Sequence, residues 1–212
     1  MKKELLILGG SSTALEIYDA VQMGYKDTYS DITFVIGDNE IADVGLKTIT
    51  DSELREYVKG KEVSYIISLA NQKLRLRLVE TMKNEGLEPI NVIHPMSMIS
   101  PKVKMGVGIY VAAGAKVSVN ATVGNHCMLN FDSTIGHDVI LKDHVMINPG
   151  ARISGHVIIG TRVLIGANST IFQGKTIGND VVIDAMTYVK QDIASNVICS
   201  QGNPIKKYKR VI

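Results

Sequence analysis

The fold is decided by one stretch, residues 135–165, which reads I-G-H-D-V-I-L-K-D-H-V-M-I-N-P-G-A-R-I-S-G-H-V-I-I-G-T-R-V-L-I. Within it an aliphatic residue recurs every six positions, at Ile135, Leu141, Ile147, Ile153, Ile159 and Ile165. A period of six fits neither an α-helix, with 3.6 residues per turn, nor a straight strand with alternating faces. It fits short strands that are separated by sharp corners and point their aliphatic side chains inward.

The same period extends in both directions, and seventeen consecutive aliphatic positions run from Ile93 to Val189 without insertion. Four positions after each of them lies a small or apolar residue, with Lys175 as the clear exception. Gly, Asn and Asp, which tolerate positive φ, lie between them. Each six-residue repeat forms one flat side of a coil, and three such sides make a triangular coil of 18 residues. Stacked coils lie about 4.8 Å apart. The sequence therefore predicts a parallel β-helix of nearly six coils over residues 93–194, stabilised by stacking of neighbouring coils.

Residues 1–92 have a different texture, in which strand-like and helix-like segments alternate. Strands are expected at 5–8, 32–36 and 65–69. One helix is expected at 14–23, a second from a cap at Asp51 or Ser52 through Tyr57, and a third that follows Asn71 and ends at Gly86. This alternation is typical of a small parallel α/β domain.

Composition excludes several classes of protein. The 212 residues include 23 Lys and Arg against 21 Asp and Glu, which gives no electrostatic footprint for nucleic acid. The first apolar run stops at Gly9, and no later segment is long enough to span a bilayer. Cys127 and Cys199 lack the spacing of a metal site or a disulfide framework. We expect a cytoplasmic protein without a nucleic-acid or membrane partner.

Several short motifs follow the predicted strands and corners. They are Leu8-Gly9-Gly10-Ser11, Gly37-Asp38-Asn39, Ala70-Asn71-Gln72, Ile93-His94-Pro95, Gly136-His137-Asp138, Pro149-Gly150-Ala151 and Gly202-Asn203-Pro204-Ile205-Lys206. With these motifs the chain resembles the hexapeptide acyltransferases that join a small Rossmann-like domain to a left-handed β-helix. Bacterial nucleotide-sugar N-acetyltransferases and sialic acid O-acetyltransferases belong to that family. The chain departs from the family pattern at Ser12-Thr13, where a Gly-His pair is usual, and at Met146, where a second histidine is common.

The resemblance implies a function for each part of the chain. Residues 1–92 would be a Rossmann-like domain that binds a nucleotide sugar, and residues 93–212 a left-handed β-helix that uses acetyl-CoA. The expected reaction is acetylation of an amine on a nucleotide-linked amino sugar. O-acetylation of a sialic acid or similar sugar, and an inactive β-helix scaffold, stay open as alternatives. A homotrimer is expected because flat prism faces pack around a three-fold axis, and in the family coenzyme A lies in the groove between neighbouring helices.

His137 is the expected catalytic base, because acetyl transfer requires removal of a proton from the attacking nucleophile. An imidazole, with an ordinary pKa of about 6.5, suits this task at neutral pH. Asp138 would orient the imidazole and stabilise its protonated form, provided that the corner turns Asp138 back toward its neighbour. Gly155, one coil along, would let a thioester approach closely and offer its N–H to the oxyanion, the role that the family assigns to this group. Asn130 would help to position the acceptor, although a corner residue with positive φ is an equal alternative.

The acceptor site is expected at the carboxyl edge of the N-terminal sheet. Gly9, Gly10 and Ser11 lie between a strand and a helix N-terminus, where backbone N–H groups favour phosphate. A tight turn with Ser12 or Thr13 as the helix cap is an equal alternative. Asp38 and Asn71 follow the next two strands at the same edge. The basic tail at 206–210 is either a contact for the phosphates of coenzyme A or a solvated tail.

No metal is expected. His126 and His144 lie one full coil apart and are expected to stack, and such a pair raises the possibility of a zinc site. The β-helical carbonic anhydrases need a further histidine five residues on, where this chain has Phe131 and Pro149. The favoured interpretation is a pair of solvent-facing ladder residues. His156 is expected to stack over Asp138 instead.

Overall fold

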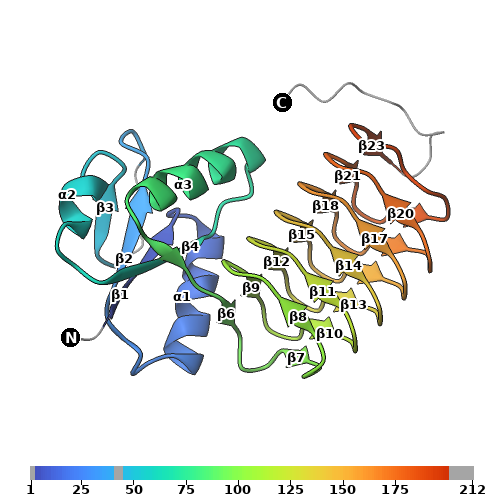
Figure 1. Ribbon diagram of the computed structural model, residues 1–212, viewed down its shortest axis with the longest axis horizontal. Coiled ribbons are helices and arrows are strands. Elements are labelled where there is room, and N and C mark those ends of the chain that lie inside the picture. The colour runs from blue at the N-terminus through green and yellow to red at the C-terminus, as the bar shows by residue number, and fades with distance from the viewer. Residues whose placement is uncertain (1–2, 41–44, 201–212) are drawn as a thin grey trace. The chain divides into compact units, whose positions relative to one another are not determined.

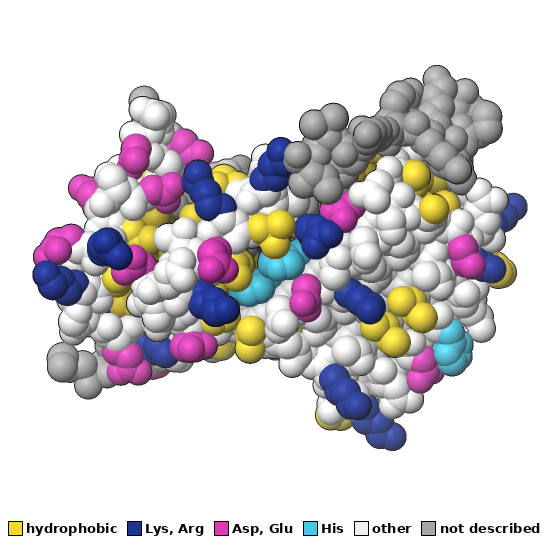
Figure 2. Space-filling model, turned by 45° about the horizontal axis from the view of Figure 1, so that its top comes forward, with side chains coloured by type: hydrophobic (Ala, Val, Ile, Leu, Met, Phe, Trp, Pro, Cys, Tyr) yellow, Lys and Arg dark blue, Asp and Glu magenta, His cyan; other side chains and the backbone are white. Residues whose placement is uncertain are grey.

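The computed structural model describes residues 3–40 and 45–200. The chain separates into two compact units, residues 1–95 and 96–212 (Figure 1). The sequence motif at 202–206 and the basic tail at 206–210 lie outside the described residues. Within the described ranges, no helix is both long and apolar enough to cross a membrane. Acidic and basic side chains are interspersed over the face of the molecule seen in Figure 2, in keeping with their nearly equal numbers.

The first unit is built on a parallel sheet with the order β3-β2-β1-β4-β5. Its strands are β1 (Lys3–Leu8), β2 (Tyr29–Ile36), β3 (Thr48–Thr50), β4 (Val63–Ile67) and β5 (Glu88–Pro89), and its helices are α1 (Ser12–Gly24), α2 (Leu54–Val58) and α3 (Gln72–Asn84). The expected parallel α/β arrangement is present. The two edge strands β3 and β5 were not expected, because runs of two or three residues carry no alternation that a sequence pattern could reveal.

Helices cover both faces of this sheet. On one face, Leu6 and Leu8 of β1 form a buried cluster with residues of α2 and α3, among them Leu54 and Leu78. On the other face α1 packs through its buried residues, and its Tyr18 ring lies 6.0 Å from the ring of Phe34 in β2. Because β1, β2 and β4 are parallel, their carboxyl ends meet at one edge, where the predicted acceptor residues follow them.

The second unit is a parallel β-helix with three faces (Figure 1). One face carries β7 (Met98–Ile99), β10 (Lys116–Val117), β13 (Thr134–Ile135), β16 (Arg152–Ile153), β19 (Thr170–Ile171) and β22 (Tyr188–Val189). The next carries β8 (Lys104–Met105), β11 (Thr122–Val123), β14 (Ile140–Leu141), β17 (Ile158–Ile159) and β20 (Thr176–Ile177). The third carries β9 (Tyr110–Val111), β12 (Met128–Leu129), β15 (Met146–Ile147), β18 (Leu164–Ile165), β21 (Val182–Ile183) and β23 (Ile198–Cys199). The short strand β6 (Val92–Ile93) precedes them in the chain.

Aliphatic side chains fill the interior as the six-residue period predicts. Ile135 and the small or apolar residue four positions on, Val139, are both fully buried, and the same pair recurs in the neighbouring coils. Lys175 breaks this pattern and is only partly buried. Most corners from Gly108 onward contain one residue with a positive φ, between 54° and 70°. In many of them it is Gly, Asn or Asp, as expected, but other corners have His, Arg or Met in this conformation: His126, His144, His156, Arg162 and Met186.

Neighbouring coils pair in register, so that each residue lies opposite its equivalent in the next coil, as Thr134 lies opposite Arg152. The last coil is an exception. Val182 pairs with Ile198, and Ile177 bridges to Ile193, so this coil is two residues shorter than the others. Side chains keep the shortened turn attached: Asp192 accepts a hydrogen bond from the backbone N–H of Thr176, at 2.9 Å.

Candidate active site

His137 and Asp138 lie in the corner between β13 and β14, and the backbone conformation of this corner brings them together. Asp138 has a φ of 57°, in the left-handed region, which turns its side chain back toward the preceding residue. The His137 Nδ1 and Asp138 Oδ2 atoms are 2.8 Å apart, within hydrogen-bond distance. With Nδ1–H donating to the carboxylate, the ring keeps its lone pair on Nε2.

Asp138 has further neighbours from the coils on either side. Asn120, one coil before it, donates from Nδ2 to Asp138 Oδ1 at 3.2 Å. The Nε2 atom of His156, one coil after it, lies 3.8 Å from Asp138 Oδ2. The hydrogen bond from His137 is the main reason why the pKa of Asp138 lies below its ordinary value, and Asn120 adds to the effect. The carboxylate is therefore ionised throughout the neutral range.

Gly155 lies one coil beyond His137, directly beneath its ring. A Cβ atom at Gly155 would lie 2.6 Å from both Cε1 and Nε2 of His137, too close for any real contact. Glycine is therefore required here for the ring to lie as it does. The backbone φ is not positive at Gly155, so the requirement is one of space and not of backbone strain.

The amide of Gly155 is a free donor in the described part of the chain. At a different corner the equivalent N–H groups are capped by side chains from the next coil: Val107 donates to Asn125 Oδ1 at 3.1 Å, and Asn125 to Asp143 Oδ1 at 2.7 Å. No such acceptor meets the N–H of Gly155 among residues 3–40 and 45–200, although the residue itself is buried. Since buried amides normally have partners, this donor is available to a ligand.

Two protein-family models match residues of the β-helix. Residues 138–173 match the family described as bacterial transferase hexapeptide (six repeats), and residues 156–191 match the hexapeptide repeat of succinyl-transferase. Together the two matches cover residues 138–191 of the β-helix. Among curated proteins, the chain is 30% identical over 77 residues to GDP-perosamine N-acetyltransferase of Escherichia coli O157:H7. The match spans 36% of the chain and 35% of that relative.

Solved structures resemble the chain over nearly its whole length. The acetyltransferase domain of PglB from Neisseria gonorrhoeae FA1090 is 25% identical, with a TM-score of 0.87 over 98% of this chain and 100% of that domain. The same domain in complex with acetyl coenzyme A has 24% identity and a TM-score of 0.88, again covering 98% and 100% of the two chains. PerB from Caulobacter crescentus, in complex with CoA and GDP-perosamine, has 22% identity and a TM-score of 0.84, covering 96% and 97%. At such identities these last two likenesses speak for the fold alone.

Asn130 is not brought together with His137, since the two residues flank β13 at different corners. Its Nδ2 atom donates to Asn148 Oδ1 at 3.2 Å. The alternative interpretation of Asn130 as the corner residue with positive φ is wrong, because Asp132 has that conformation in this turn.

The two stacked histidines only partly match expectation. The rings of His126 and His144 stack, with centroids 5.2 Å apart and planes at 12°. However, His126 is only 6% exposed, so its expected position facing solvent is wrong. The cause lies one coil earlier: a Cβ atom at Gly108 would come within 2.3 Å of His126 Nδ1, so the missing side chain leaves room for the ring to fold down.

At the carboxyl edge of the N-terminal sheet, the predicted acceptor residues follow β1, β2 and β4. Gly9 has a φ of 123° and packs tightly against Ser68 and Leu69, with Gly10 beside it, so the chain makes a tight turn after β1. Ser11 is the N-cap residue of α1, but its side chain makes no capping hydrogen bond to that helix. The tight turn therefore accounts for Gly9, but the expected helix cap at Ser12 or Thr13 is wrong, because both residues lie inside α1. Ser11 keeps an exposed hydroxyl at the helix N-terminus.

Asp38 and Asn71 have structural hydrogen bonds of their own. Asp38 Oδ1 accepts from the N–H of Ser52 at 2.9 Å, and this bond is the main reason why the pKa of Asp38 lies below its ordinary value. Asn71 caps α3 by accepting from the N–H of Leu74 at 3.1 Å. Asp38 also lines an open cavity of about 340 Å³ together with Asp51 and with Arg77 of α3.

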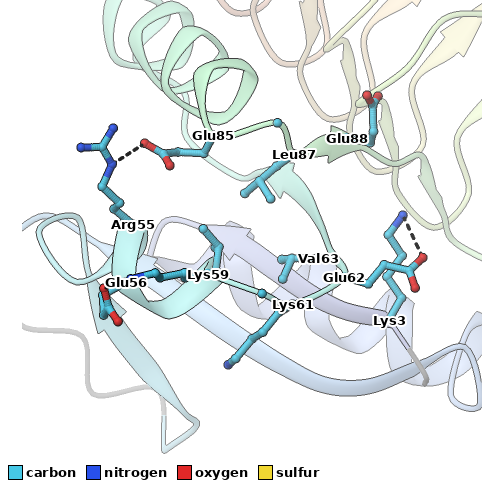
Figure 3. A pocket seen from close by; sticks show the side chains of 13 residues that line it. Lys3, Arg55, Glu56, Lys59, Lys61, Glu62, Val63, Glu85, Leu87 and Glu88 are labelled. Carbon is cyan, nitrogen blue, oxygen red and sulfur yellow. Dashed lines mark hydrogen bonds and ion pairs between the residues drawn. The ribbon is translucent and has the colours of Figure 1, made fainter.

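A larger cavity, of about 690 Å³, lies at the opposite edge, where β1, β4 and β5 begin (Figure 3). Its cations and carboxylates largely pair with one another, as Arg55 does with Glu85 at 3.2 Å and Lys3 with Glu62 at 4.0 Å. Because neighbours already satisfy these charges and no candidate residue lies there, size alone does not make it the active site.

The sequence placed His156 over Asp138, and the separation of 3.8 Å between His156 Nε2 and Asp138 Oδ2 confirms this prediction. It did not single out Asn120 as a neighbour of Asp138. The available signal was the coil length, because subtracting one coil from Asp138 leads to Asn120.

Proposed function

We propose that the protein is an acetyl-CoA-dependent N-acetyltransferase that acts on the amine of a nucleotide-linked amino sugar. The observation that carries the proposal is the geometry at one corner: a His137–Asp138 pair lies over Gly155, whose N–H is free within the described residues. A base with a fixed tautomer and an unused amide on the adjacent coil are the two groups that attack on a thioester requires. The match to GDP-perosamine N-acetyltransferase supports the choice of an amino-sugar acceptor, and the fold shared with the acetyltransferase domain of PglB supports acetyl transfer.

In the proposed reaction, His137 acts as the base. The neutral sugar amine attacks the thioester carbonyl carbon, and Nε2 accepts the proton that the nitrogen loses. The imidazolium that forms is stabilised by Asp138 through the 2.8 Å contact at Nδ1. The carbonyl oxygen becomes negatively charged and receives a hydrogen bond from the N–H of Gly155. The carbon–sulfur bond then breaks, and the proton on Nε2 neutralises the departing thiolate of coenzyme A.

Residues 1–92 are proposed to form a Rossmann-like domain that holds the nucleotide part of the acceptor. Gly9, Gly10 and Ser11 would bind phosphate at the N-terminus of α1. Asp38 and Asn71, exposed at the same edge, would contact the nucleoside. An anchor remote from the reacting amine raises the effective concentration of that amine at the base.

The β-helix of residues 93–212 is proposed to be left-handed and to form a homotrimer. In such an assembly three prisms share flat faces, and acetyl-CoA would lie in the groove between two of them, within reach of His137. Asn130, at the other end of β13, would then take part in positioning the acceptor. We place the protein in the cytoplasm, where acetyl-CoA and sugar nucleotides are made.

The direct test is release of the coenzyme A thiol from acetyl-CoA in the presence of nucleotide-linked amino sugars. We expect release that depends on the amino sugar, together with a product heavier by one acetyl group. Matched sugars with a hydroxyl in place of the amine, and free sialic acids, separate N- from O-acetylation. Absence of release with every acceptor tested would favour the inactive scaffold.

A further inference from the structure

We propose that His137, Asp138 and His156 form a binding site for a divalent transition-metal ion such as Zn²⁺, and that an ion bound there inhibits the enzyme. In the described part of the chain this is the one group of three or more His, Cys, Asp or Glu side chains whose potential ligand atoms converge. One such atom from each residue lies within 4.8 Å of the other two. The site differs from the His126–His144 pair, which the sequence raised as a zinc candidate.

The spacing of the three groups fits a tetrahedral ion. Ligands about 2.0–2.1 Å from Zn²⁺ at tetrahedral angles are roughly 3.3 Å from one another. Asp138 Oδ2 lies 2.8 Å from His137 Nδ1 and 3.8 Å from His156 Nε2, one separation shorter than this value and one longer. The two imidazole rings meet edge to face with centroids 4.9 Å apart. Small rotations of the side chains would bring all three onto one ion.

The side chains are accessible and have suitable chemistry. His137, Asp138 and His156 are 48%, 38% and 55% exposed, so an ion can enter from solvent and keep water in its fourth position. Imidazole and carboxylate are the donors that Zn²⁺ commonly takes from proteins.

A bound ion would stop His137 from acting as a base, whichever ring nitrogen it occupies. An ion on Nε2 takes the lone pair that would accept the proton from the amine. An ion on Nδ1 displaces the proton to Nε2, which then carries N–H and has no lone pair to offer. Inhibition therefore rests on the proposed function, whereas binding of the ion does not.

The experiment measures Zn²⁺ binding to the full-length protein without an affinity tag, by competition with a chromophoric chelator. The test variant is His156→Asn and the matched control is His144→Asn. Both histidines have a φ near 60° in corner turns, a conformation that asparagine tolerates. We expect one ion per chain in the wild type and in His144→Asn, and an affinity weaker by at least about tenfold in His156→Asn. In parallel, acetyl transfer is measured with and without Zn²⁺, each variant being compared with its own metal-free rate.

The two readouts separate the two proposals. Equal affinity of wild type and His156→Asn, or loss of affinity in His144→Asn alone, would overturn the metal site. Binding that depends on His156 but leaves acetyl transfer unaffected would retain the site and reject inhibition through His137. Binding that depends on His156 in a protein without acetyltransferase activity would retain the site while the proposed function fails.

Discussion

Replacement of Gly155 by alanine tests the active site at the point where its geometry is tightest. The added Cβ atom would lie 2.6 Å from Cε1 and Nε2 of His137. Ordinary contacts between heavy atoms are about 3.5–4.0 Å, so the ring must move by about 1 Å. A displacement of that size can cost a factor of about 10² in rate, or about 2.7 kcal/mol in the activation barrier. The fold should persist, because Gly155 does not have a positive φ.

The assay is kcat for acetyl transfer in wild type, Gly155→Ala, His137→Ala and the double variant, with thermal unfolding of each as the control for folding. If the methyl group acts by displacing the ring, Gly155→Ala should cost about 10² in the wild type and almost nothing in His137→Ala. A full rate in folded Gly155→Ala would refute the reasoning. An equal loss in both backgrounds would show that the methyl group acts elsewhere, for example by blocking the thioester.

Further outcomes are expected at the base, at its carboxylate, at the acceptor edge and in the assembly. His137→Ala should lose about 10²–10⁴ of kcat while remaining folded, because the side chain is half exposed; an unchanged kcat would reject the base assignment. The pKa of Asp138, held below 3.8 mainly by the hydrogen bond from His137, should rise in His137→Ala, so the carboxylate loses its charge at a higher pH; carbon NMR titration of both proteins checks this sign. Asp38→Ala should raise KM for the sugar nucleotide and leave KM for acetyl-CoA almost unchanged. Asp38→Asn is the control, because it keeps an oxygen acceptor for the N–H of Ser52. Parallel shifts in both constants would contradict a division of labour between the units. Light scattering should give three times the chain mass of 23.1 kDa, and a stable monomer at working concentration would exclude the trimer.

The β-helix could be predicted from the sequence because every coil repeats the same requirement. Each side of a coil must place an aliphatic side chain in the interior, as Ile135 does. The six-residue period can therefore be recognised in the sequence before the fold is known. The pairing of His137 with Asp138 could be stated as a condition on the corner, and a φ of 57° at Asp138 meets it. The position of His137 above Gly155 followed from counting one coil forward along the chain.

What the sequence did not reveal depends on contacts between coils and on very short strands. His126 was expected to face solvent, but its burial depends on the absence of a side chain at Gly108. β3 contains three residues, and its place beside β2 depends on tertiary pairing. The hydrogen bond between Asp38 and Ser52 joins residues 14 positions apart in the chain, and no local sequence pattern connects residues at that separation.

The short final coil has a consequence for the symmetry of the protein. Coils of equal length are related by simple translation, so a stack of them has no intrinsic end, and its last strands would serve as a template for another copy. The final coil, in which Ile198 pairs with Val182, is two residues shorter and does not follow the same translation. The last coil still pairs with the regular coil before it on all three faces, but the sequence offset falls from 18 residues to 16 on two of them. The loss of two residues thus breaks the translational symmetry of the stack in its last coil.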